Sequence, residues 1–244
     1  MCRMLGVVFR KKFPEETLSE LKILSEAGLI PGEEKPGHRD GWGIVAFEGG
    51  RPRYLGRSVK PAFSDRAYDE AIVDVERLSK PNILIAHVRA ASSGGVAIEN
   101  THPFIVDGLA FAHNGTVKGM KADPRGRAKG KTDSEIIAHL VADRMREKGS
   151  LMSAMKSVVR EEIDKRTFTG AVMLASDGQV LVGYRDFSIP ERAAYYGLKT
   201  AESEGSAVSL FQETAVSCKG ECSEVGKREM VSVSLELDVI RETL

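Results

Sequence analysis

The clearest helix start in the chain is the stretch Thr132-Asp133-Ser134-Glu135-Ile136-Ile137-Ala138-His139-Leu140-Val141. Thr132 stands where an N-cap would stand and Glu135 follows three residues later, which is the spacing of a capping box. Apolar residues then recur at helical spacing (Ile136, Ile137, Leu140 and Val141), so we predict a helix with one buried face. A second helix is predicted to follow it, over residues 150–164.

Segments typical of strands lie on both sides of this helical block. Before it we predict strands at 4–9, 41–47, 53–56, 82–88 and 109–112, with helices at 14–27 and, capped by Ser64, at 64–78. After it we predict strands at 170–175, 179–184, 194–199, 207–211 and 230–237. Because the strands flank a helical block without strict βαβ alternation, the pattern favours an α+β fold over a doubly wound parallel sheet. We find no repeat or linker, and we predict a single domain over residues 1–244.

Composition indicates an ordinary soluble protein of 244 residues, with 42% hydrophobic and 29% charged residues. Its 35 basic and 35 acidic residues cancel, so no global field attracts nucleic acid or membrane. The longest apolar runs, such as Asn82–Val88 and Gly170–Ala175, are too short to span a bilayer. The start of the chain has no secretory signal, and three cysteines (Cys2, Cys218 and Cys222) form no disulfide framework. We therefore expect a cytoplasmic protein.

Cys2 is the first candidate for chemistry. A small residue at position 2 lets methionine aminopeptidase act, so we expect Met1 to be removed. The nitrogen of Cys2 then changes from an amide to an α-amine whose reference pKa is about 7.7–8.0, suitable for proton transfer near neutrality. A thiol beside its own amine is a complete nucleophile–base pair. The alternative is that Cys2 is only a small buried residue at the start of a strand.

Three further segments carry groups suited to chemistry on an amino-acid substrate. Arg89 directly follows the apolar strand at 82–88, where its guanidinium can bind a carboxylate with two parallel hydrogen bonds, unless it simply points to solvent. Asn114-Gly115 is either a hairpin turn or an oxyanion hole. Asp133 either only helps to start its helix or binds a substrate ammonium.

Gly41-Trp42-Gly43 holds the only tryptophan of the chain. The flanking glycines suggest a tight backbone path near a cleft. The alternative is an indole packed in the core.

Taken in order, several motifs together resemble the class II glutamine amidotransferases, which are N-terminal-nucleophile hydrolases. The similar segments are Met-Cys-Arg-Met-Leu-Gly at the start, Asp-Gly-Trp-Gly near 40, Ala-His-Val-Arg near 86, Asn-Thr-His-Pro-Phe near 100, His-Asn-Gly near 113 and Thr-Asp-Ser-Glu near 132. The resemblance is strongest to the small single-domain branch that includes the γ-glutamyl hydrolase of ergothioneine biosynthesis. All of these motifs lie within residues 2–135.

The resemblance implies a four-layer α/β/β/α sandwich with two central antiparallel sheets. It also implies that Cys2 is the nucleophile and its α-amine the base, that Asn114 and Gly115 form the oxyanion hole, that Arg89 binds the α-carboxylate and that Asp133 binds the α-amine. The expected reaction is hydrolysis of the γ-amide of glutamine or of a γ-glutamyl compound through a Cys2 thioester.

The chain departs from the pattern in two ways. Synthetase-fused members continue after the arginine with Trp-Ala-Thr-His-Gly, whereas this chain has Ala90-Ala91-Ser92-Ser93-Gly94. No second domain is present to receive ammonia, so either a separate synthase or synthetase subunit uses it or hydrolysis itself is the purpose. A non-catalytic glutamine-sensing or assembly subunit is the alternative to an enzyme.

Three other features have competing interpretations. His87, His102 and His113 suit a zinc site in number but not in spacing, and we expect neither a metal nor a cofactor. Cys218 and Cys222 are interpreted as two ordinary thiols, with a disulfide or a shared metal as alternatives. A basic run at 118–131 is either a solvated loop or a lid or docking surface for an anionic substrate or partner; it contains Lys118, Lys121, Arg125, Arg127, Lys129 and Lys131 against one acid, Asp123.

Overall fold

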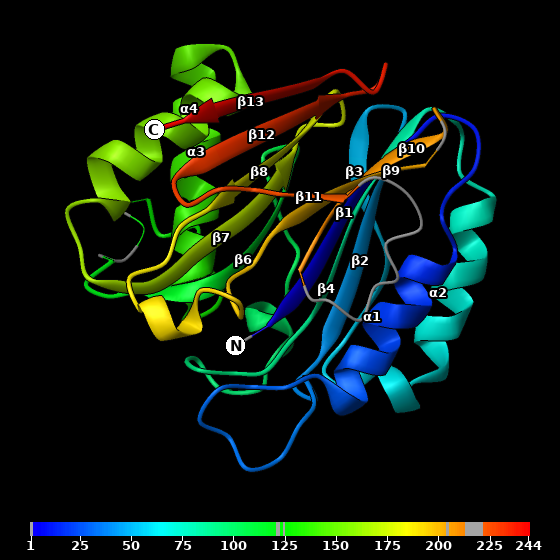
Figure 1. Cartoon of the computed structure of the whole chain (residues 1–244), viewed down its shortest axis with the longest axis horizontal. Helices are drawn as coiled ribbons and strands as arrows, with labels where there is room; N and C mark the ends of the chain where they lie inside the picture. The colour runs from blue at the N-terminus through cyan, green and yellow to red at the C-terminus, as the bar shows by residue number, and fades with distance from the viewer. Residues whose placement is uncertain (1, 121–122, 124, 204, 213–221) are drawn as a thin grey trace.

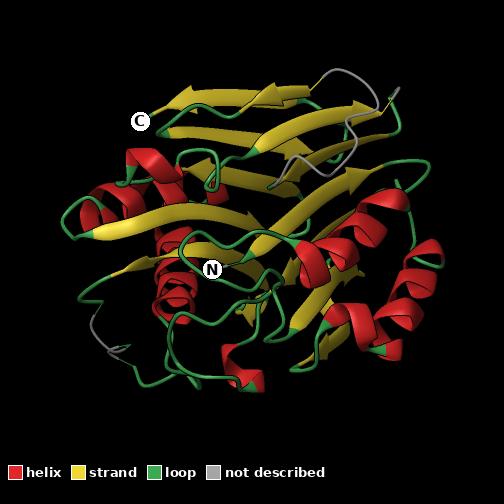
Figure 2. Cartoon of the chain, turned by 60° about the horizontal axis from the view of Figure 1, so that its bottom comes forward, coloured by secondary structure: helices red, strands yellow, loops and turns green. Residues whose placement is uncertain are grey.

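The computed structural model describes residues 2–120, 123, 125–203, 205–212 and 222–244. Within them, two antiparallel sheets lie face to face with helices on their outer sides (Figures 1 and 2). The seven-stranded sheet has the order β11-β9-β10-β1-β4-β2-β3, and the six-stranded sheet has the order β13-β12-β8-β7-β6-β5. This arrangement confirms the α+β sandwich of two antiparallel sheets.

The seven-stranded sheet carries helices α1 and α2 on its outer face (Figure 1). Its elements are β1 (Arg3–Phe9), α1 (Glu16–Ala27), β2 (Trp42–Glu48), β3 (Arg51–Ser58), α2 (Arg66–Glu76), β4 (Asn82–Val88), β9 (Lys199–Ser203), β10 (Ala207–Phe211) and β11 (Cys222–Glu224). Trp42 is fully buried there: its ring packs edge-on against Tyr68 at 4.9 Å and its Nε1 donates to Asp65. The indole is therefore part of the core.

The six-stranded sheet carries helices α3 and α4 on its outer face (Figure 1). Its elements are β5 (Phe104–Val106), β6 (Leu109–Val117), α3 (Asp133–Lys148), α4 (Leu151–Val158), which continues into a π-helical turn at Val159–Ile163, β7 (Phe168–Ser176), β8 (Val180–Arg185), β12 (Glu229–Ser234) and β13 (Val239–Thr243). Ile137 and Val141 of α3 are fully buried against this sheet, as the apolar spacing predicted.

The two sheets face each other across an apolar layer, and β1 shows how the sequence builds it. Side chains alternate along a strand, so Val7 and Phe9 pack against the helices while Met4 and Val8 face the other sheet. Gly6 leaves room between them for Leu181, whose methyl groups would lie 2.9 Å from a Cβ at that position. Since both faces of β1 are buried, its sequence after Arg3 is a continuous apolar run.

Several predicted boundaries are wrong for local reasons. The cap of α2 is Asp65, whose carboxylate accepts from the N–H of Ala67, and Ser64 lies in a short 3₁₀ turn at Ala62–Ser64. The strand predicted at 194–199 is instead a turn that follows the 3₁₀ segment Pro190–Arg192, and β9 begins only at Lys199. The strand predicted at 230–237 ends at Ser234, where the chain turns toward β13.

The predicted capping box is only half formed. Thr132 is the N-cap of α3 and its hydroxyl accepts from the N–H of Glu135. The Glu135 carboxylate accepts instead from the backbone N–H groups of Lys129 and Gly130. Glu135 therefore fixes the incoming loop rather than completing the cap.

Two further findings bear on composition. Among the described residues, no helix combines the length and apolarity needed to cross a bilayer. Cys222 lies exposed in β11 and is disulfide-bonded, which corrects its interpretation as an ordinary thiol. Cys218 lies outside the described residues.

Candidate functional site

The sequence-predicted residues Cys2, Arg89, Gly115 and Asp133 line one small pocket. They come from four places in the chain: the start of β1, the residue after β4, the far part of β6 and the first turn of α3. Antiparallel pairing of β1 with β4, in which Arg3 faces Val88, brings the start of one strand to the end of the other. The rest of the wall is formed by Ala90, Ser92, Ser93, His102, His113, Thr132 and Ser134.

Cys2 is held at its backbone nitrogen. This nitrogen donates to Oδ1 of Asn114 at 3.0 Å, and the thiol lies 3.8 Å from the carbonyl oxygen of Ala90. Asn114 in turn donates from Nδ2 to Oε1 of Gln212 at 3.1 Å. Cys2 is 7% exposed, whereas Asn114 and Gln212 are almost completely buried. The nitrogen that would become the α-amine thus already has a fixed hydrogen-bond acceptor.

Gln212 and Arg3 belong to this site, although sequence reasoning did not find them. The backbone N–H of Gln212 donates to Met4, which places its side chain beside Asn114. Arg3 donates from Nη1 to the carbonyl of Cys2 at 2.9 Å, and its guanidinium lies 3.9 Å from the ring centre of Tyr195. The only sequence signal for Arg3 was its position as an arginine inside an apolar strand, and no sequence signal pointed to Gln212.

Asn114-Gly115 lies inside β6 and not in a hairpin turn, so the turn interpretation is wrong. Gly115 has φ +147°, and a Cβ there would lie 1.7 Å from the carbonyl oxygen of Gly170 on β7. The register of β6 shifts between Gly115 and Val117, as in a β-bulge. Only glycine allows β6 and β7 to approach this closely, and the irregularity places Gly115 at the wall of the pocket.

Arg89 is buried and turned toward the loop that follows it. Nη1 donates to the carbonyl of Gly95 at 2.8 Å and Nη2 donates to that of Ser93 at 2.9 Å. Burial lowers the pKa of Arg89, and the nearby Cys2 and Asp40 partly oppose this shift. Each terminal nitrogen of a guanidinium carries two hydrogens, so one on each remains for a carboxylate in the pocket.

Asp133 and Ser134, in the first turn of α3, are each fixed by a hydrogen bond to β6. Oδ2 of Asp133 accepts from the N–H of Val117 at 2.6 Å. The next residue, Ser134, lies 3.0 Å from Nδ1 of His113, whose Nε2 lies 3.3 Å from the carbonyl of Gly170. A carbonyl can only accept, so Nε2 carries the proton and Nδ1 accepts from the serine hydroxyl. Burial lowers the pKa of His113, in agreement with this neutral ring.

The other two histidines of the central motifs stack on each other. The rings of His87 and His102 are 4.4 Å apart, both are buried, and burial lowers the pKa of each well below its usual value. Among the described residues, no three His, Cys, Asp or Glu side chains are grouped to hold a metal ion. His102 lines the pocket and His87 stacks on it.

Comparison with known proteins identifies the family to which this α+β fold with its cysteine-centred pocket belongs. The model of the class II glutamine amidotransferases matches residues 1–216. This chain belongs to that family.

Relatives support the assignment at moderate identity. The chain is 30% identical over 238 residues to an uncharacterised protein of Methanocaldococcus jannaschii, covering 90% of this chain and 62% of that protein. It is 29% identical over 227 residues to the "Putative glutamine amidotransferase YafJ" of Escherichia coli, covering 88% of this chain and 85% of YafJ. The chain thus spans less than two thirds of the archaeal protein and most of the bacterial one.

Solved structures show the same fold at low identity. The glutamine phosphoribosylpyrophosphate amidotransferase of B. subtilis has a TM-score of 0.67 and 18% identity, covering 99% of this chain and 49% of that one. A glutamine aminotransferase class-II domain protein from Silicibacter pomeroyi has a TM-score of 0.61 and 18% identity, covering 100% of this chain and 99% of the other. These likenesses concern the fold alone.

Proposed function

We propose that this protein hydrolyses the γ-amide of glutamine or of a γ-glutamyl compound through a Cys2 thioester. The observation that carries the proposal is the hydrogen bond from the Cys2 nitrogen to Asn114 in a pocket that also holds Arg89 and Asp133. A sulfur nucleophile, an adjacent nitrogen with a fixed acceptor, one cation and one carboxylate are the groups that such a reaction needs.

Removal of Met1 converts the Cys2 nitrogen into a base. Asn114 Oδ1 then orients the amine, which takes the proton of the thiol as sulfur attacks the γ-carbonyl carbon. The C–S bond forms, the amine returns the proton to the leaving nitrogen, and the C–N bond breaks. Water next attacks the thioester and releases glutamate with the free thiol.

Arg89 and Asp133 are proposed to bind the amino-acid head group of the substrate. The free hydrogens of the guanidinium bind the α-carboxylate, and the Asp133 oxygen that does not hold Val117 accepts from the α-ammonium. Asn114 Nδ2, which has a second hydrogen beside the one given to Gln212, and the N–H of Gly115 are proposed to stabilise the oxyanion. Loss of one such donor typically costs about 3–4 kcal/mol of barrier.

The substrate must move part of the wall to enter, because the pocket has a volume of about 20 Å³, room for about one water molecule. The loop after Arg89 is the part that can yield. Ser92 to Val96 are exposed, and Gly94 and Gly95 both have positive φ.

A free-standing hydrolase with a bulky leaving amine is favoured over a subunit that only releases ammonia. In this chain the residues after Arg89 are Ala90-Ala91-Ser92, where synthetase-fused members have Trp-Ala-Thr. Ala90 and Ser92 line both the Cys2 pocket and an adjoining hollow of about 290 Å³. The other side of this hollow is formed by residues 30–40, among them Glu33, Lys35 and Arg39. A leaving amine larger than ammonia fits this space.

The deciding experiment pairs an intact mass with a glutamate-release assay. The mass establishes that Met1 is absent, and release is measured from glutamine and from γ-glutamyl amides of increasing size. Cys2→Ala is expected to lower turnover at least about 10³-fold. Full turnover by Cys2→Ala would exclude the mechanism.

Two alternatives give different results in the same assay. A subunit that supplies ammonia would prefer glutamine and would turn over faster with its partner. A glutamine sensor would be stabilised thermally by glutamine and would release no glutamate.

A further inference from the structure

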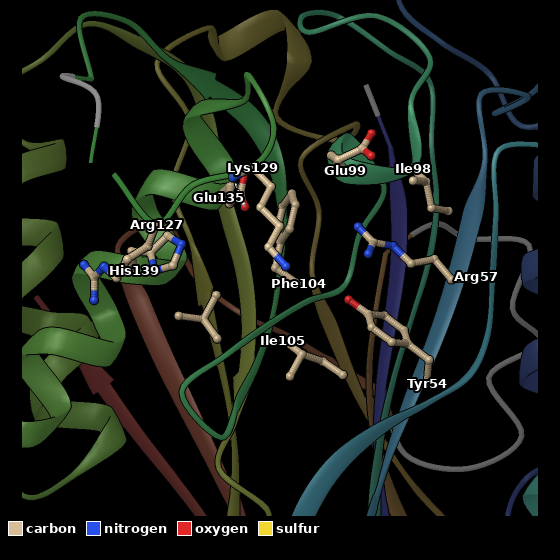
Figure 3. Close-up of a pocket in the computed structure, with 11 residues that line it drawn as sticks. Tyr54, Arg57, Ile98, Glu99, Phe104, Ile105, Arg127, Lys129, Glu135 and His139 are labelled. Atoms are coloured by element: carbon tan, nitrogen blue, oxygen red, sulfur yellow. Dashed lines mark hydrogen bonds between the residues drawn. The ribbon is translucent and has the colours of Figure 1, made fainter. Parts of the chain in front are cut away.

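Figure 3 shows a second cavity, of about 370 Å³. It shares no lining residue with the Cys2 pocket. Its volume is within the range of small-molecule sites. Its wall comes from β3, the 3₁₀ turn Ile98–Asn100, β5, α3 and the basic run before α3. The lining residues are Tyr54, Arg57, Ile98, Glu99, Phe104, Ile105, Val106, Arg127, Lys129, Glu135 and His139.

One part of this cavity is apolar. Phe104, Ile105 and Val106 of β5 and the partly exposed Ile98 contribute only hydrocarbon surface. A ligand that fills the cavity therefore has an apolar body, since a fully polar one would leave its groups unpaired against this surface.

His139 supplies an unused polar group. It is 7% exposed, it lines the cavity, and neither ring nitrogen has a hydrogen-bond partner in the described part of the chain (Figure 3). Buried polar groups are almost always hydrogen-bonded, so an imidazole in this state points to a ligand group that it can bind. A neutral imidazole offers one donor and one acceptor.

The cations and the carboxylates of the cavity differ in how far they are already occupied. Glu135 uses both of its oxygens for the N–H groups of Lys129 and Gly130, and Glu99 is exposed to water. Among the described residues, no ion pair involves the ammonium of Lys129.

The two arginines of the wall are not equivalent. The guanidinium of Arg57 donates through Nε and Nη2 to the uncharged carbonyl of Thr101 and lies 5.0 Å from the ring centre of Tyr54. Arg127 is neutralised by Asp123, Asp143 and Asp107. Among the cavity-lining residues, and within the described part of the chain, Arg57 and Lys129 are therefore the cations without a carboxylate partner.

We propose that this cavity binds a small organic anion, a carboxylate or a phosphate monoester carried on an apolar body. The anionic group pairs with Lys129 and Arg57, His139 donates or accepts one further hydrogen bond, and the apolar body covers the β5 surface. This assigns a ligand to the basic run that the Cys2 chemistry does not use.

Asn100 joins the walls of the two pockets. Its Nδ2 donates to the carbonyl of Gly94 at 2.6 Å, one residue from the carbonyl that holds Arg89, and its Oδ1 accepts from the N–H of Lys131 at 2.8 Å. The proposed site is thus adjacent to the Cys2 pocket but chemically separate, and its test requires no turnover.

The test is direct binding by calorimetry with the full chain. Phenyl phosphate and benzoate are the probes, and benzylamine is the cationic probe of similar size. We expect saturable one-to-one binding of at least one anion, and the better of the two identifies the phosphate or the carboxylate class. Lys129→Gln, an exposed change that spares the core, is expected to weaken binding about tenfold or more, as loss of a charge-assisted hydrogen bond does. Lys148→Gln, at the other end of α3, leaves binding unchanged.

Three results would overturn the proposal. The first is that neither anion binds at about 10 mM, which corresponds to an affinity too weak for a built site. The second is that benzylamine binds as tightly as the anions. The third is that the Lys129→Gln variant and the unmodified chain bind with equal affinity.

Discussion

His113 and His139 are both buried histidines, yet the pockets around them treat them in opposite ways. His113, in β6, uses both nitrogens, one with Ser134 and one with Gly170. His139, in α3, uses neither nitrogen within the described protein. Within the described residues, the protein fixes the ring of His113 beside Cys2 and leaves that of His139 unpaired in the neighbouring cavity, although His102 at the Cys2 pocket also has no partner for either ring nitrogen.

The same contrast extends to the volumes. Around Cys2 the space is about 20 Å³, and Asn114, Arg89 and Asp133 are all already hydrogen-bonded. The second cavity is about 370 Å³. Pre-organised groups suit chemistry, because they need not reorient as charge develops. An open space with an unpaired imidazole suits binding.

The largest expected effect is that of Gly115→Ala. The new Cβ would meet the carbonyl oxygen of Gly170 at 1.7 Å, and alanine strongly disfavours φ +147°. We expect a loss of about 3–5 kcal/mol in the free energy of unfolding, measured by urea denaturation. Gly119→Ala is the matched control, since its φ is +71° and no atom lies within 4 Å, and it should cost only about 1–2 kcal/mol. Equal losses for the two variants would show that β6 and β7 are not tightly packed at the pocket.

The comparison of the two histidines can be tested by replacing each with leucine. His113→Leu leaves the carbonyl of Gly170 and the hydroxyl of Ser134 unpaired, so we expect it to lower the free energy of unfolding by about 2–4 kcal/mol. His139→Leu removes two unpaired nitrogens and should change stability by less than about 1 kcal/mol, in either direction. If both variants lost the same stability, the distinction between a satisfied and an unsatisfied imidazole would fail.

Gln212→Leu tests whether the Cys2 pocket depends on a residue that sequence reasoning missed. The variant lacks the side-chain carbonyl oxygen of Gln212, which accepts from the Asn114 amide. Asn114 is then no longer fixed, and the Cys2 nitrogen loses a fixed partner. We expect kcat for glutamine to fall about tenfold while KM changes little, because the head-group contacts are intact. Gln212→Glu, which retains an acceptor, should recover most of kcat. A change in KM alone would place Gln212 in substrate binding instead.

The smallest expected effect is on the pH dependence of stability. Burial lowers the pKa of His102 well below its usual value, whereas in the unfolded chain the ring takes up a proton near pH 6.5. Unfolding therefore binds protons as the pH falls below about 6.5, and the stability contributed by the neutral ring is complete above that pH and lost below it. His102→Leu should reduce the slope of unfolding free energy against pH by up to about 1.4 kcal/mol per unit between about pH 6 and 5. An unchanged slope would mean that His102 is protonated in the folded state.

The secondary structure was predictable where a local pattern and its tertiary environment agree. The apolar runs at β1 and β4 and the helix that begins at Thr132 appear nearly as predicted. The strand prediction for residues 194–198 is wrong because this segment is a turn. Its aromatic and apolar side chains fill the layer between the sheets, so their apolar character reflects burial and not strand pairing. The turn interpretation of Asn114-Gly115 is wrong in the opposite sense: these residues lie in a strand, because sheet pairing overrides a strong turn signal.

The chain order of the motifs and the choice of Cys2, Arg89, Asn114, Gly115 and Asp133 as candidate site residues were predictable from the sequence alone. The proposal that the Cys2 nitrogen is the base rests on removal of Met1, which the intact mass tests. Only the tertiary structure decided that Arg3 and Gln212 support these residues, that Glu135 holds the loop before α3, and that His139 is left unpaired beside a cavity. Hydrogen bonds between groups 98 residues apart, such as that of Asn114 with Gln212, depend on which strands pair, and no local pattern encodes that choice.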